Sequence, residues 1–505
     1  MRLIPSSRGG ALWRFALGAA IVVAFTATTT AVAGLLEIKQ IVSYLNETPA
    51  LKNVPVKLPA PGDPQTILVI GSDHRAGTSY NSANTDTMML IRLNASSSTI
   101  NLLSIPRDLQ VQLPDGMSKL NAAYSEGGPK LLIDTLKQQV FPGLAVNHIV
   151  DVNFGGFEDL VNAIGCVYTD VDHRYYNNTL QTDYSSIDIQ PGYQKLCGPQ
   201  ALEFVRFRHT DSDIVRNARQ QDFIRWAKDQ YSVNQLISNR GKLLKIFGAH
   251  VQTDHSLHTS DGLINLFNLV LNADGHGIKQ IPFPAAFLPC PVTAAGQTPC
   301  YVVPTSTVAE QAAFEAFMTP TVPSAPSSSA ARHKRKPTKL SDAGLIADAS
   351  DGRDQAIALG ERTLPVYYPK LIADGSQYCA SLTGNCDELP NLDSDYAGAY
   401  PRAYEIHGQD GAVYPAYRMT LVINAALGEY YGVQGTTWQH PPILDDINGT
   451  RRVEGKLLDL YQSGAHISLV AWRTTQGTYW ISNTLIDTLS NSEMIAIAAS
   501  LTRHR

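Results

Sequence analysis

Before residue 320, the chain alternates between short apolar runs and stretches in which apolar positions recur with helical spacing. Thr66–Ile70 is such a run, and it ends at Gly71-Ser72-Asp73, as expected of a buried strand that enters a loop. Further strands are predicted at Thr87–Leu93, Thr99–Ile105, Ile149–Asn153, Val167–Val171 and Ile278–Pro282. Helices are predicted at Lys130–Val140, Phe157–Ile164, Gln200–Phe204, Arg216–Tyr231, Leu236–Phe247, Gly262–Leu271 and Val308–Phe317. Strands that alternate with helices predict a layered α/β domain.

The pattern stops at residues 319–345, which are rich in Pro, Ser and Ala and then basic. Such a segment cannot bury enough apolar surface to fold alone, so we predict a disordered linker. Beyond it, residues 346–505 are expected to form a smaller α+β domain, with strands at Arg418–Ile423, His466–Ala471 and Thr478–Asn483 and a terminal helix at Ser492–Leu501. The many Tyr and Trp residues of this domain either build its core, which is the favoured interpretation, or face a carbohydrate.

The N-terminus carries an apolar stretch, 15–36, that contains no charged residue and is long enough to cross a bilayer as a helix. Arg2, Arg8 and Arg14 precede it, so residues 1–14 are expected in the cytoplasm and the rest of the chain outside it. The alternative is a cleaved signal peptide that ends at Ala31-Val32-Ala33. Residues 37–63 are polar and contain prolines, which predicts a stalk between the membrane and the first domain.

Composition narrows the choice of function. The chain has 505 residues, 44% of them hydrophobic, and a formal net charge of −5, which describes a globular protein without the basic excess of a nucleic-acid binder. Its six cysteines fit an extracytoplasmic location, where disulfides persist. Short loops favour the pairs Cys290–Cys300 and Cys379–Cys386, which leaves Cys166 with Cys197, although six cysteines allow 15 pairings and the connectivity stays open.

Acidic and basic side chains cluster where the first strands begin and end. Asp73 follows the first strand and Asp86 begins the second, and a pair of carboxylates suits Mg²⁺. Arg75 lies two residues after Asp73, and Arg107 follows Pro106 at the end of the third strand. Ligands of α/β sheets gather at strand ends, so we expect one cleft there, although a structural network of salt bridges would use the same residues.

A second group of arginines lies in Ala201–Gln221, where guanidinium groups can bind phosphate oxygens two at a time. Arg206 and Arg208 would share a face only in an extended segment, with Phe207 buried opposite. Arg216, Arg219 and Gln220 share one face of a helix that is expected to begin near Asp213, and a helix N-terminus favours an anion. Several arginines suit a diphosphate better than a lone carboxylate. A solvated helix face with internal ion pairs is the alternative.

Six ordered motifs carry a resemblance to a known family. They are GSDHR (71–75), NTD (84–86), SIPRD (104–108), KLNAAY (119–124), VDVNFGGFEDLVNAIGCV (150–167) and LCGPQALEFVRFRHTDSDIVRNARQQ (196–221). In order and spacing they resemble the LytR-CpsA-Psr proteins over residues 64–318. The resemblance implies a catalytic domain with a three-layer α-β-α core and a mixed central sheet, held at the cell membrane by an uncleaved single-pass anchor with the catalytic domain outside the cytoplasm.

The resemblance also implies an activity. Such proteins transfer a glycopolymer, such as teichoic acid, capsular polysaccharide or arabinogalactan, from a polyprenyl diphosphate carrier to peptidoglycan through a phosphodiester bond. The implied site residues are Asp73 and Asp86 for Mg²⁺, Asp73 and Arg107 for catalysis, and Arg75, Arg107, Arg206, Arg208, Arg216 and Gln220 for the diphosphate. Arg219 is secondary among the contacts, and Arg225 is assigned to the surface or to packing. The sequence leaves open which glycopolymer is carried.

Two other functions stay open at this point. In a polyprenyl diphosphate phosphatase, water would replace the acceptor hydroxyl. In a non-catalytic envelope binding or regulatory protein, the arginines would serve stability or binding alone. A role on nucleic acid is disfavoured, because the residues that could contact it are expected outside the cytoplasm.

Overall fold

The structure of the chain is a computed structural model that forms two compact units, each assembled from separate stretches of sequence. Unit 1 consists of Met1–Cys166, Cys197–Leu202 and Gln220–Ala325, and unit 2 of Val167–Leu196, Glu203–Arg219 and Pro326–Arg505. The structure describes residues 50–60, 62–72, 85–177, 186–207, 212–230, 249–259, 278–288, 301–320, 344–360, 363–379 and 400–504, with some isolated positions besides. The predicted domain limits are continuous in sequence, whereas these units are not, and the limits stay a prediction.

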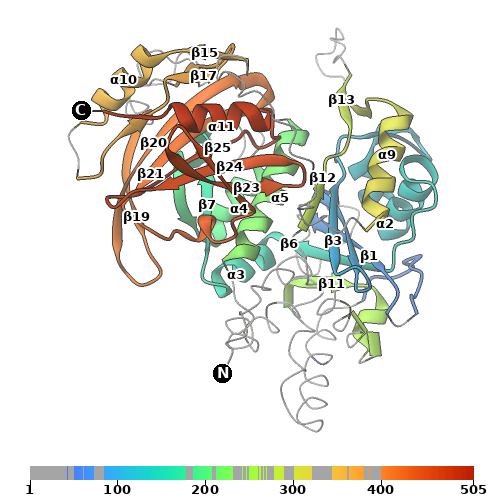
Figure 1. Ribbon diagram of the computed structural model, residues 1–505. Coiled ribbons are helices and arrows are strands. Elements are labelled where there is room, and N and C mark those ends of the chain that lie inside the picture. Colours follow the sequence, from blue (N-terminus) through green and yellow to red (C-terminus); the bar gives the residue numbers. More distant parts are fainter. Residues whose placement is uncertain are drawn as a thin grey trace. The chain divides into compact units, whose positions relative to one another are not determined.

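Unit 1 is built on a six-stranded mixed sheet with the strand order β11-β6-β1-β2-β3-β12 (Figure 1). The strands are β1 (Gln65–Ser72), β2 (Thr85–Asn94), β3 (Thr99–Ser104), β6 (His148–Asn153), β11 (Val251–Thr253) and β12 (Ile278–Ile281). Strand β1 is parallel to β6 and antiparallel to β2, while β3 is antiparallel to β2 and parallel to β12. The α/β class and the mixed central sheet are therefore confirmed, while the three-layer arrangement stays a prediction.

Helices α2 (Leu120–Thr135) and α9 (Thr307–Met318) pack on one face of this sheet and enclose its core (Figure 1). Leu68 and Ile70 of β1 belong to the same buried cluster as Leu132 of α2 and Phe317 of α9. These strand residues alternate with Ile67, which is also fully buried, so both faces of β1 are covered. The other helices of unit 1 are α3 (Phe154–Ala163), η4 (His255–His258) and η3 (Leu136–Val140), which is a π-helical extension of α2. Two antiparallel strand pairs complete the unit: β4 (Gln110–Leu113) with β5 (Gly116–Lys119), and β13 (Ala285–Phe287) with β14 (Val302–Pro304). Helices α4 (Gly198–Arg206) and α5 (Asp213–Asp229) contribute residues to both units.

The second half of the predicted stalk packs on unit 1. Leu51 is buried in the core of the unit, and its amide donates to the carbonyl of Thr253 on β11 at 2.9 Å. Farther along, the amide of Lys57 donates to the carbonyl of Val146 at 2.9 Å. The predicted anchor, 15–36, lies outside the described residues. Within the part of the chain that is described, no helix is both long and apolar enough to cross a membrane.

Unit 2 contains an eight-stranded antiparallel sheet with the order β18-β20-β21-β25-β24-β23-β22, in which β19 also pairs with β20 (Figure 1). Its strands are β18 (Gln377–Tyr378), β19 (Arg402–His407), β20 (Val413–Asn424), β21 (Glu429–Thr436), β22 (Gly449–Val453), β23 (Lys456–Ser463), β24 (His466–Arg473) and β25 (Thr478–Ser482). Smaller elements complete it: α10 (Ala349–Ala358), α11 (Asn491–Ser500), η7 (Ala425–Leu427), η8 (Pro442–Leu444), β15 (Leu345–Ala347), β16 (Tyr367–Tyr368), β17 (Leu371–Ala373) and β26 (Thr502–Arg503).

Helix α11 covers one face of the large sheet, with Ile497 packed in the same cluster as Tyr417, Tyr431 and Tyr479. These aromatic rings are fully buried. The expectation that aromatic residues of this part of the chain build a core is confirmed for them.

The other face of the sheet packs against the stretch Val167–Leu196, which precedes it in the chain by some two hundred residues. That stretch contains two antiparallel strand pairs, β7 (Val167–Val171) with β10 (Gly192–Leu196) and, between them in the chain, β8 (Tyr175–Asn177) with β9 (Ile187–Ile189). Tyr168 and Tyr193 of the first hairpin share a buried cluster with Trp480 of β25. Beside them, Asp170 forms a buried ion pair with Arg418 of β20, at 3.0 Å. The stretch Val167–Leu196 and the C-terminal sheet therefore form one compact unit.

Most predicted elements with strong periodicity are present. The predicted strands in both parts of the chain correspond to β1, β2, β3, β6, β7, β12, β20, β24 and β25, and predicted helices to α2 with η3, α3, α4, α5, α9 and α11. Most of the residues predicted as helices at 236–247 and 262–271 lie outside the described residues, as does the greater part of the predicted linker. The structure joins Cys166 to Cys197 and Cys379 to Cys386, while Cys290 and Cys300 are not described.

Candidate functional site

The polar ends of β1, β2 and β6 meet at one edge of the unit 1 sheet. Ser72, the last residue of β1, pairs with Thr85 at the start of β2 and with Asn153 at the end of β6. The pairing follows from direction: β6 runs parallel to β1 and ends beside it, whereas β2 runs back from the same edge. Ser72 and Thr85, which precede the predicted metal carboxylates Asp73 and Asp86 in the sequence, are therefore paired at adjacent strand ends.

Several predicted site residues cannot be placed further. Asp73, Arg75 and Arg208 lie outside the described residues, and only the backbone of Asp86 is described, within β2. Among the residues that are described, no three His, Cys, Asp or Glu side chains are grouped closely enough to hold a metal ion. Because the two predicted carboxylates are not part of that set, the fit of Mg²⁺ stays a prediction.

Arg107 lies just beyond β3, in the turn that Pro106 begins. Its Nε is 3.8 Å from Asp108 Oδ1, and its side chain is 19% exposed. Lys119 Nζ lies closer to the same carboxylate oxygen, at 3.0 Å, so Asp108 has a second and nearer cation. The Arg107 side chain as a whole is partly exposed, although its Nε is buried.

Two glutamines tie helix α5 to the same region of unit 1. Gln220 Nε2 donates to the hydroxyl of Thr87 on β2 at 2.8 Å, and Gln221 Nε2 donates to the hydroxyl of Ser104 at the end of β3 at 2.7 Å. All four side chains are largely buried. The predicted diphosphate residue Gln220 therefore contacts β2, the strand that contains Asp86. Gln221, which was not among the predicted site residues, contacts the end of β3, three residues before Arg107.

Arg206 of α4 and Arg216 of α5, two predicted diphosphate contacts, differ in their exposure to solvent. Arg216 lies in α5 and is 2% exposed, with its Nη2 3.0 Å from Asp213 Oδ1 in the first turn of the helix. Arg206 is exposed, and it ends helix α4, so the expected extended segment through Arg206 is wrong at this residue. The chain leaves the helix only at Phe207, which is buried as expected.

Arg219 is a structural residue. Its side chain is fully buried, and its Nη1 donates to the carbonyls of Phe204 and Phe207, at 2.7 and 3.0 Å. A helix leaves its last carbonyls without partners inside the helix, and a guanidinium is well suited to bind them. Arg219 therefore holds the end of α4 in place. Arg225, on the same helix, pairs with Asp222 at 2.6 Å, which fits its assignment to packing.

A buried aspartate, Asp151, supports the end of β1, although it was not among the predicted site residues. Asp151 of β6 accepts a hydrogen bond from the hydroxyl of Ser72 at 2.7 Å and another from the hydroxyl of Tyr124 of α2. It is 4% exposed. The sequence contained a signal for this residue, because Asp151 interrupts the apolar residues Ile149, Val150 and Val152 of the strand. By fixing Ser72, it fixes the point at which the chain enters the segment with Asp73 and Arg75.

A cavity of about 620 Å³ lies at the opposite ends of β1 and β6, where Gln65 and His148 line it. There His148 Nδ1 lies 3.3 Å from Asp254 Oδ2 and 3.1 Å from the hydroxyl of Ser256. Burial acts to raise the pKa of Asp254, but the hydrogen bond and charge of His148 and the hydrogen bonds of Ser256 and Ile149 outweigh it, and the pKa lies below its ordinary value. The Ser256 hydroxyl and the Asp254 carboxylate both approach Nδ1 of His148. In a Ser-His-Asp catalytic triad the serine and the aspartate bind opposite nitrogens of the histidine, so this group does not have the geometry of a triad.

The model of the LytR_cpsA_psr family matches residues 34–311, which is more than half of the chain. The chain belongs to this family. The match includes the sheet edge and α5, and it extends well before residue 64, where the resemblance of the motifs began.

Curated members of the LytR-CpsA-Psr family are similar to this chain over part of its length. One is the polyisoprenyl-teichoic acid–peptidoglycan teichoic acid transferase TagU of Oceanobacillus iheyensis, 33% identical over 230 residues, which are 43% of this chain and 68% of the relative. TagT of Bacillus subtilis, a transferase with the same description, is 30% identical over 40% of this chain and 63% of its own length. The probable cell wall biosynthesis protein LcpB of Corynebacterium glutamicum is 35% identical over 31% of this chain and 39% of its own length. A solved structure of TagT bound to LIIa-WTA is 23% identical, with a TM-score of 0.38, and the match covers 52% of this chain and 92% of that one.

Proposed function

We propose that this protein transfers a glycopolymer from a polyprenyl diphosphate carrier to peptidoglycan. Membership of the LytR-CpsA-Psr family supports a glycopolymer transferase, and relatives named as teichoic acid transferases support the two substrates. In the structure, the supporting observation is the attachment of α5 to the strand ends of unit 1 through Gln220 and Gln221. It brings a helix with a predicted diphosphate residue to β2, which contains Asp86, and to the end of β3, which precedes Arg107.

In the proposed reaction, a peptidoglycan hydroxyl attacks the phosphorus atom that bears the glycopolymer. A new P–O bond forms to the acceptor, and the bond to the bridging oxygen of the diphosphate breaks. The products are a phosphodiester between glycopolymer and peptidoglycan, and polyprenyl phosphate, which takes the electron pair of the broken bond. Asp73 is the proposed acceptor of the hydroxyl proton. Phosphoryl transfer of this kind depends mainly on positioning and on charge neutralisation.

Arginine supplies that neutralisation in the proposal. Arg107 contacts the diphosphate from the end of β3, and its partial exposure makes it accessible to a ligand. Arg75, Arg206, Arg208 and Arg216 are further proposed contacts, with Gln220 beside them. Mg²⁺, held by Asp73 and Asp86, would add charge neutralisation at the phosphates, and it stays a proposal. The location at the cytoplasmic membrane, through a single N-terminal anchor, is proposed from the apolar stretch 15–36.

The test is an assay of the products. The purified protein is incubated with a polyprenyl-diphosphate-linked glycan, Mg²⁺ and a peptidoglycan acceptor, and products are separated by mass. The proposal expects an adduct of glycan and acceptor joined through phosphate. Free phosphorylated glycan without any adduct would instead identify a phosphatase, and binding without turnover would identify a binding protein.

A pair of variants connects the activity to the site. Arg107→Ala should lower the transfer rate on the order of a hundredfold, because a charged group that stabilises the transition state is lost. Arg225→Ala is the matched control, since Arg225 lies on α5 but pairs with Asp222. Equal activity of both variants would exclude Arg107 from the site.

A further inference from the structure

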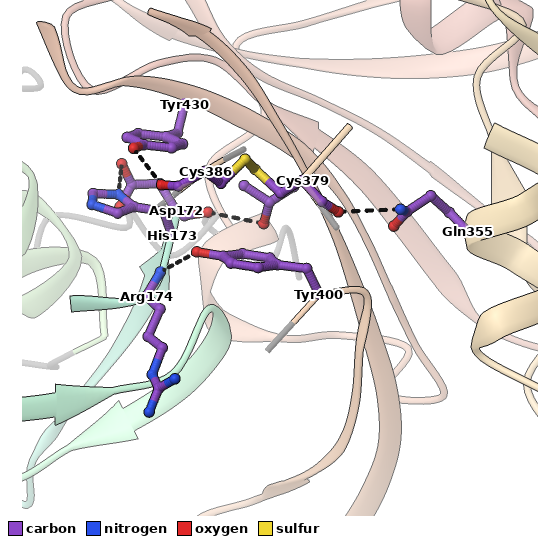
Figure 2. Close-up of a disulfide and its surroundings, with 9 residues drawn as sticks. Asp172, His173, Arg174, Gln355, Cys379, Cys386, Tyr400 and Tyr430 are labelled. Atoms are coloured by element: carbon purple, nitrogen blue, oxygen red, sulfur yellow. Dashed lines mark hydrogen bonds and ion pairs between the residues drawn. A yellow bond between two sulfur atoms is a disulfide. The ribbon is translucent and has the colours of Figure 1, made fainter. Parts of the chain in front are cut away.

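A column of buried side chains connects the C-terminal sheet to the arginine segment, Glu203–Arg219, within unit 2. It begins at Tyr430 of β21, whose ring stacks on His173 with centroids 3.9 Å apart and an angle of 13° between the planes. Figure 2 shows the two rings facing each other beside the Cys379–Cys386 disulfide. The hydroxyl of Tyr430 donates to the carbonyl of Cys386 at 3.1 Å, so this ring is held from the C-terminal side.

The column continues from His173 through charged and aromatic groups. His173 Nδ1 lies 3.2 Å from Asp172 Oδ2, and Asp172 Oδ1 accepts a hydrogen bond from the hydroxyl of Tyr175 at 2.6 Å. Burial acts to raise the pKa of Asp172, but the neighbouring His173, Tyr175 and Arg219 outweigh it and lower the pKa below its usual value. The carboxylate therefore stays charged in the interior, where a charge without partners would be strongly disfavoured.

The column ends on the arginine segment. The Arg219 guanidinium lies over the Tyr175 ring at 4.5 Å, and from there Arg219 binds the carbonyls of Phe204 and Phe207. The Tyr175 ring also packs edge-on against both phenylalanine rings, with centroids 5.2 and 5.0 Å away. Each side chain of the column is more than nine-tenths buried. Phe207 directly follows Arg206, so the column holds the backbone at the end of the helix that carries Arg206.

A second contact reaches the helix with Arg216. Gly428, directly before β21, has φ +65, and a Cβ added to it would lie 2.9 Å from a methyl group of Val215 on α5. Only glycine adopts this backbone conformation without cost and also allows such a close approach. Val215 is 1% exposed and precedes Arg216. The same short stretch, Gly428–Tyr430, thus supports both α4 and α5.

We propose that the C-terminal domain is a positioning element for the arginine segment, and that Tyr430 and Gly428 transmit its support to Arg206 and Arg216. The importance of this support for substrate rests on the proposed function, because the arginines matter there as diphosphate contacts. Tyr430 and Gly428 are positioning residues, which act on the substrate through the segment that they hold.

The structure supplies matched controls for both residues. Tyr431 is the next residue of β21, equally buried, but its ring lies on the opposite face, in the cluster under α11. Tyr430→Leu and Tyr431→Leu therefore remove the same ring from the two faces of one strand. Gly455 has φ +82, and a Cβ there would meet nothing within 4 Å. Gly428→Ala and Gly455→Ala share the backbone penalty, but only the first forces a side chain against Val215.

The experiment measures hydrogen–deuterium exchange of the full chain by mass spectrometry. In Tyr430→Leu and Gly428→Ala, amides of 203–219 should exchange roughly tenfold faster, because local opening of the segment becomes easier. Tyr431→Leu and Gly455→Ala should leave exchange in that segment unchanged. Tyr430→Phe should restore protection, because it keeps the ring that stacks on His173. Unchanged exchange in the first two variants, or equal change in their controls, would overturn the proposal.

Binding of farnesyl diphosphate, in the presence of Mg²⁺, gives the functional readout on the same proteins. If the native chain binds this probe, Tyr430→Leu and Gly428→Ala should weaken its affinity roughly fivefold or more, with the affinity of the controls unchanged. An unchanged affinity despite faster exchange would overturn the positioning role. If the native chain does not bind prenyl diphosphate, the proposed function loses its support, while the exchange data still decide whether the C-terminal domain holds the segment.

Discussion

Removal of the Arg418 guanidinium should strongly destabilise unit 2. Its Nη1 lies 3.0 and 3.3 Å from the two carboxylate oxygens of Asp170, and the two side chains are 0% and 3% exposed. Gly432 makes room for Arg418, since a Cβ there would come within 2.8 Å of its Nε. In Arg418→Met, the Asp170 carboxylate would keep the Trp480 indole, at 3.4 Å, as its one side-chain donor among the described residues.

The expected loss follows from the burial of the carboxylate that is left behind. When one partner of a buried ion pair is removed, stability falls by about 3–5 kcal/mol, because the remaining charge has lost both water and its counter-ion. Replacing both partners with apolar residues costs far less, since no charge stays buried. The double variant Asp170→Leu/Arg418→Met should therefore be clearly more stable than the sum of the two single variants implies.

Urea-induced unfolding under non-reducing conditions measures these differences, followed by tryptophan fluorescence and by circular dichroism. Arg452→Met is the control, because Arg452 is exposed on β22 in the same unit and its replacement should change stability by less than about 0.5 kcal/mol. A loss in Arg418→Met as small as that of the control would refute the reasoning, since it would mean that water reaches the Asp170 carboxylate.

Three further predictions concern other parts of the chain. Burial raises the pKa of Glu310 to about 7, above its ordinary value of 4.5, so the folded state favours the protonated carboxyl. The free energy of unfolding of unit 1 should therefore increase as pH falls from about 7 to 4.5. Glu310→Gln should accordingly stabilise unit 1 by about 1–3 kcal/mol at alkaline pH, and a pH series of thermal melts should show the gain disappearing below pH 4.5. Arg107→Ala should abolish most glycopolymer transfer at unchanged melting temperature while Arg225→Ala retains it, as the product assay would show; parallel losses would contradict the site. Chelation by EDTA should stop transfer and added Mg²⁺ should restore it, whereas full activity in EDTA would remove the metal from the proposal.

The sequence by itself determined the local elements and the family. Strands such as β1 and helices such as α5 depend on the periodicity of neighbouring side chains, so they could be predicted with shifts of a few residues at their ends. The ordered motifs from GSDHR to NARQQ likewise sufficed for the family to which the chain belongs. Local pattern was misleading at Arg206, because alternation with Arg208 indicated an extended segment where α4 continues through Arg206.

The tertiary structure decided which of these charged residues serve structure. Arg219 and Arg216 share one helix face, yet Arg219 binds backbone carbonyls, and this depends on where α4 ends. Asp170 and Arg418 are 248 residues apart, and no local pattern connects them. Their pairing results from the burial of one sheet face against a distant hairpin, in which each buried charge requires a partner. That burial also joins the C-terminal domain to the arginine segment, which the sequence presented as separate parts of the chain.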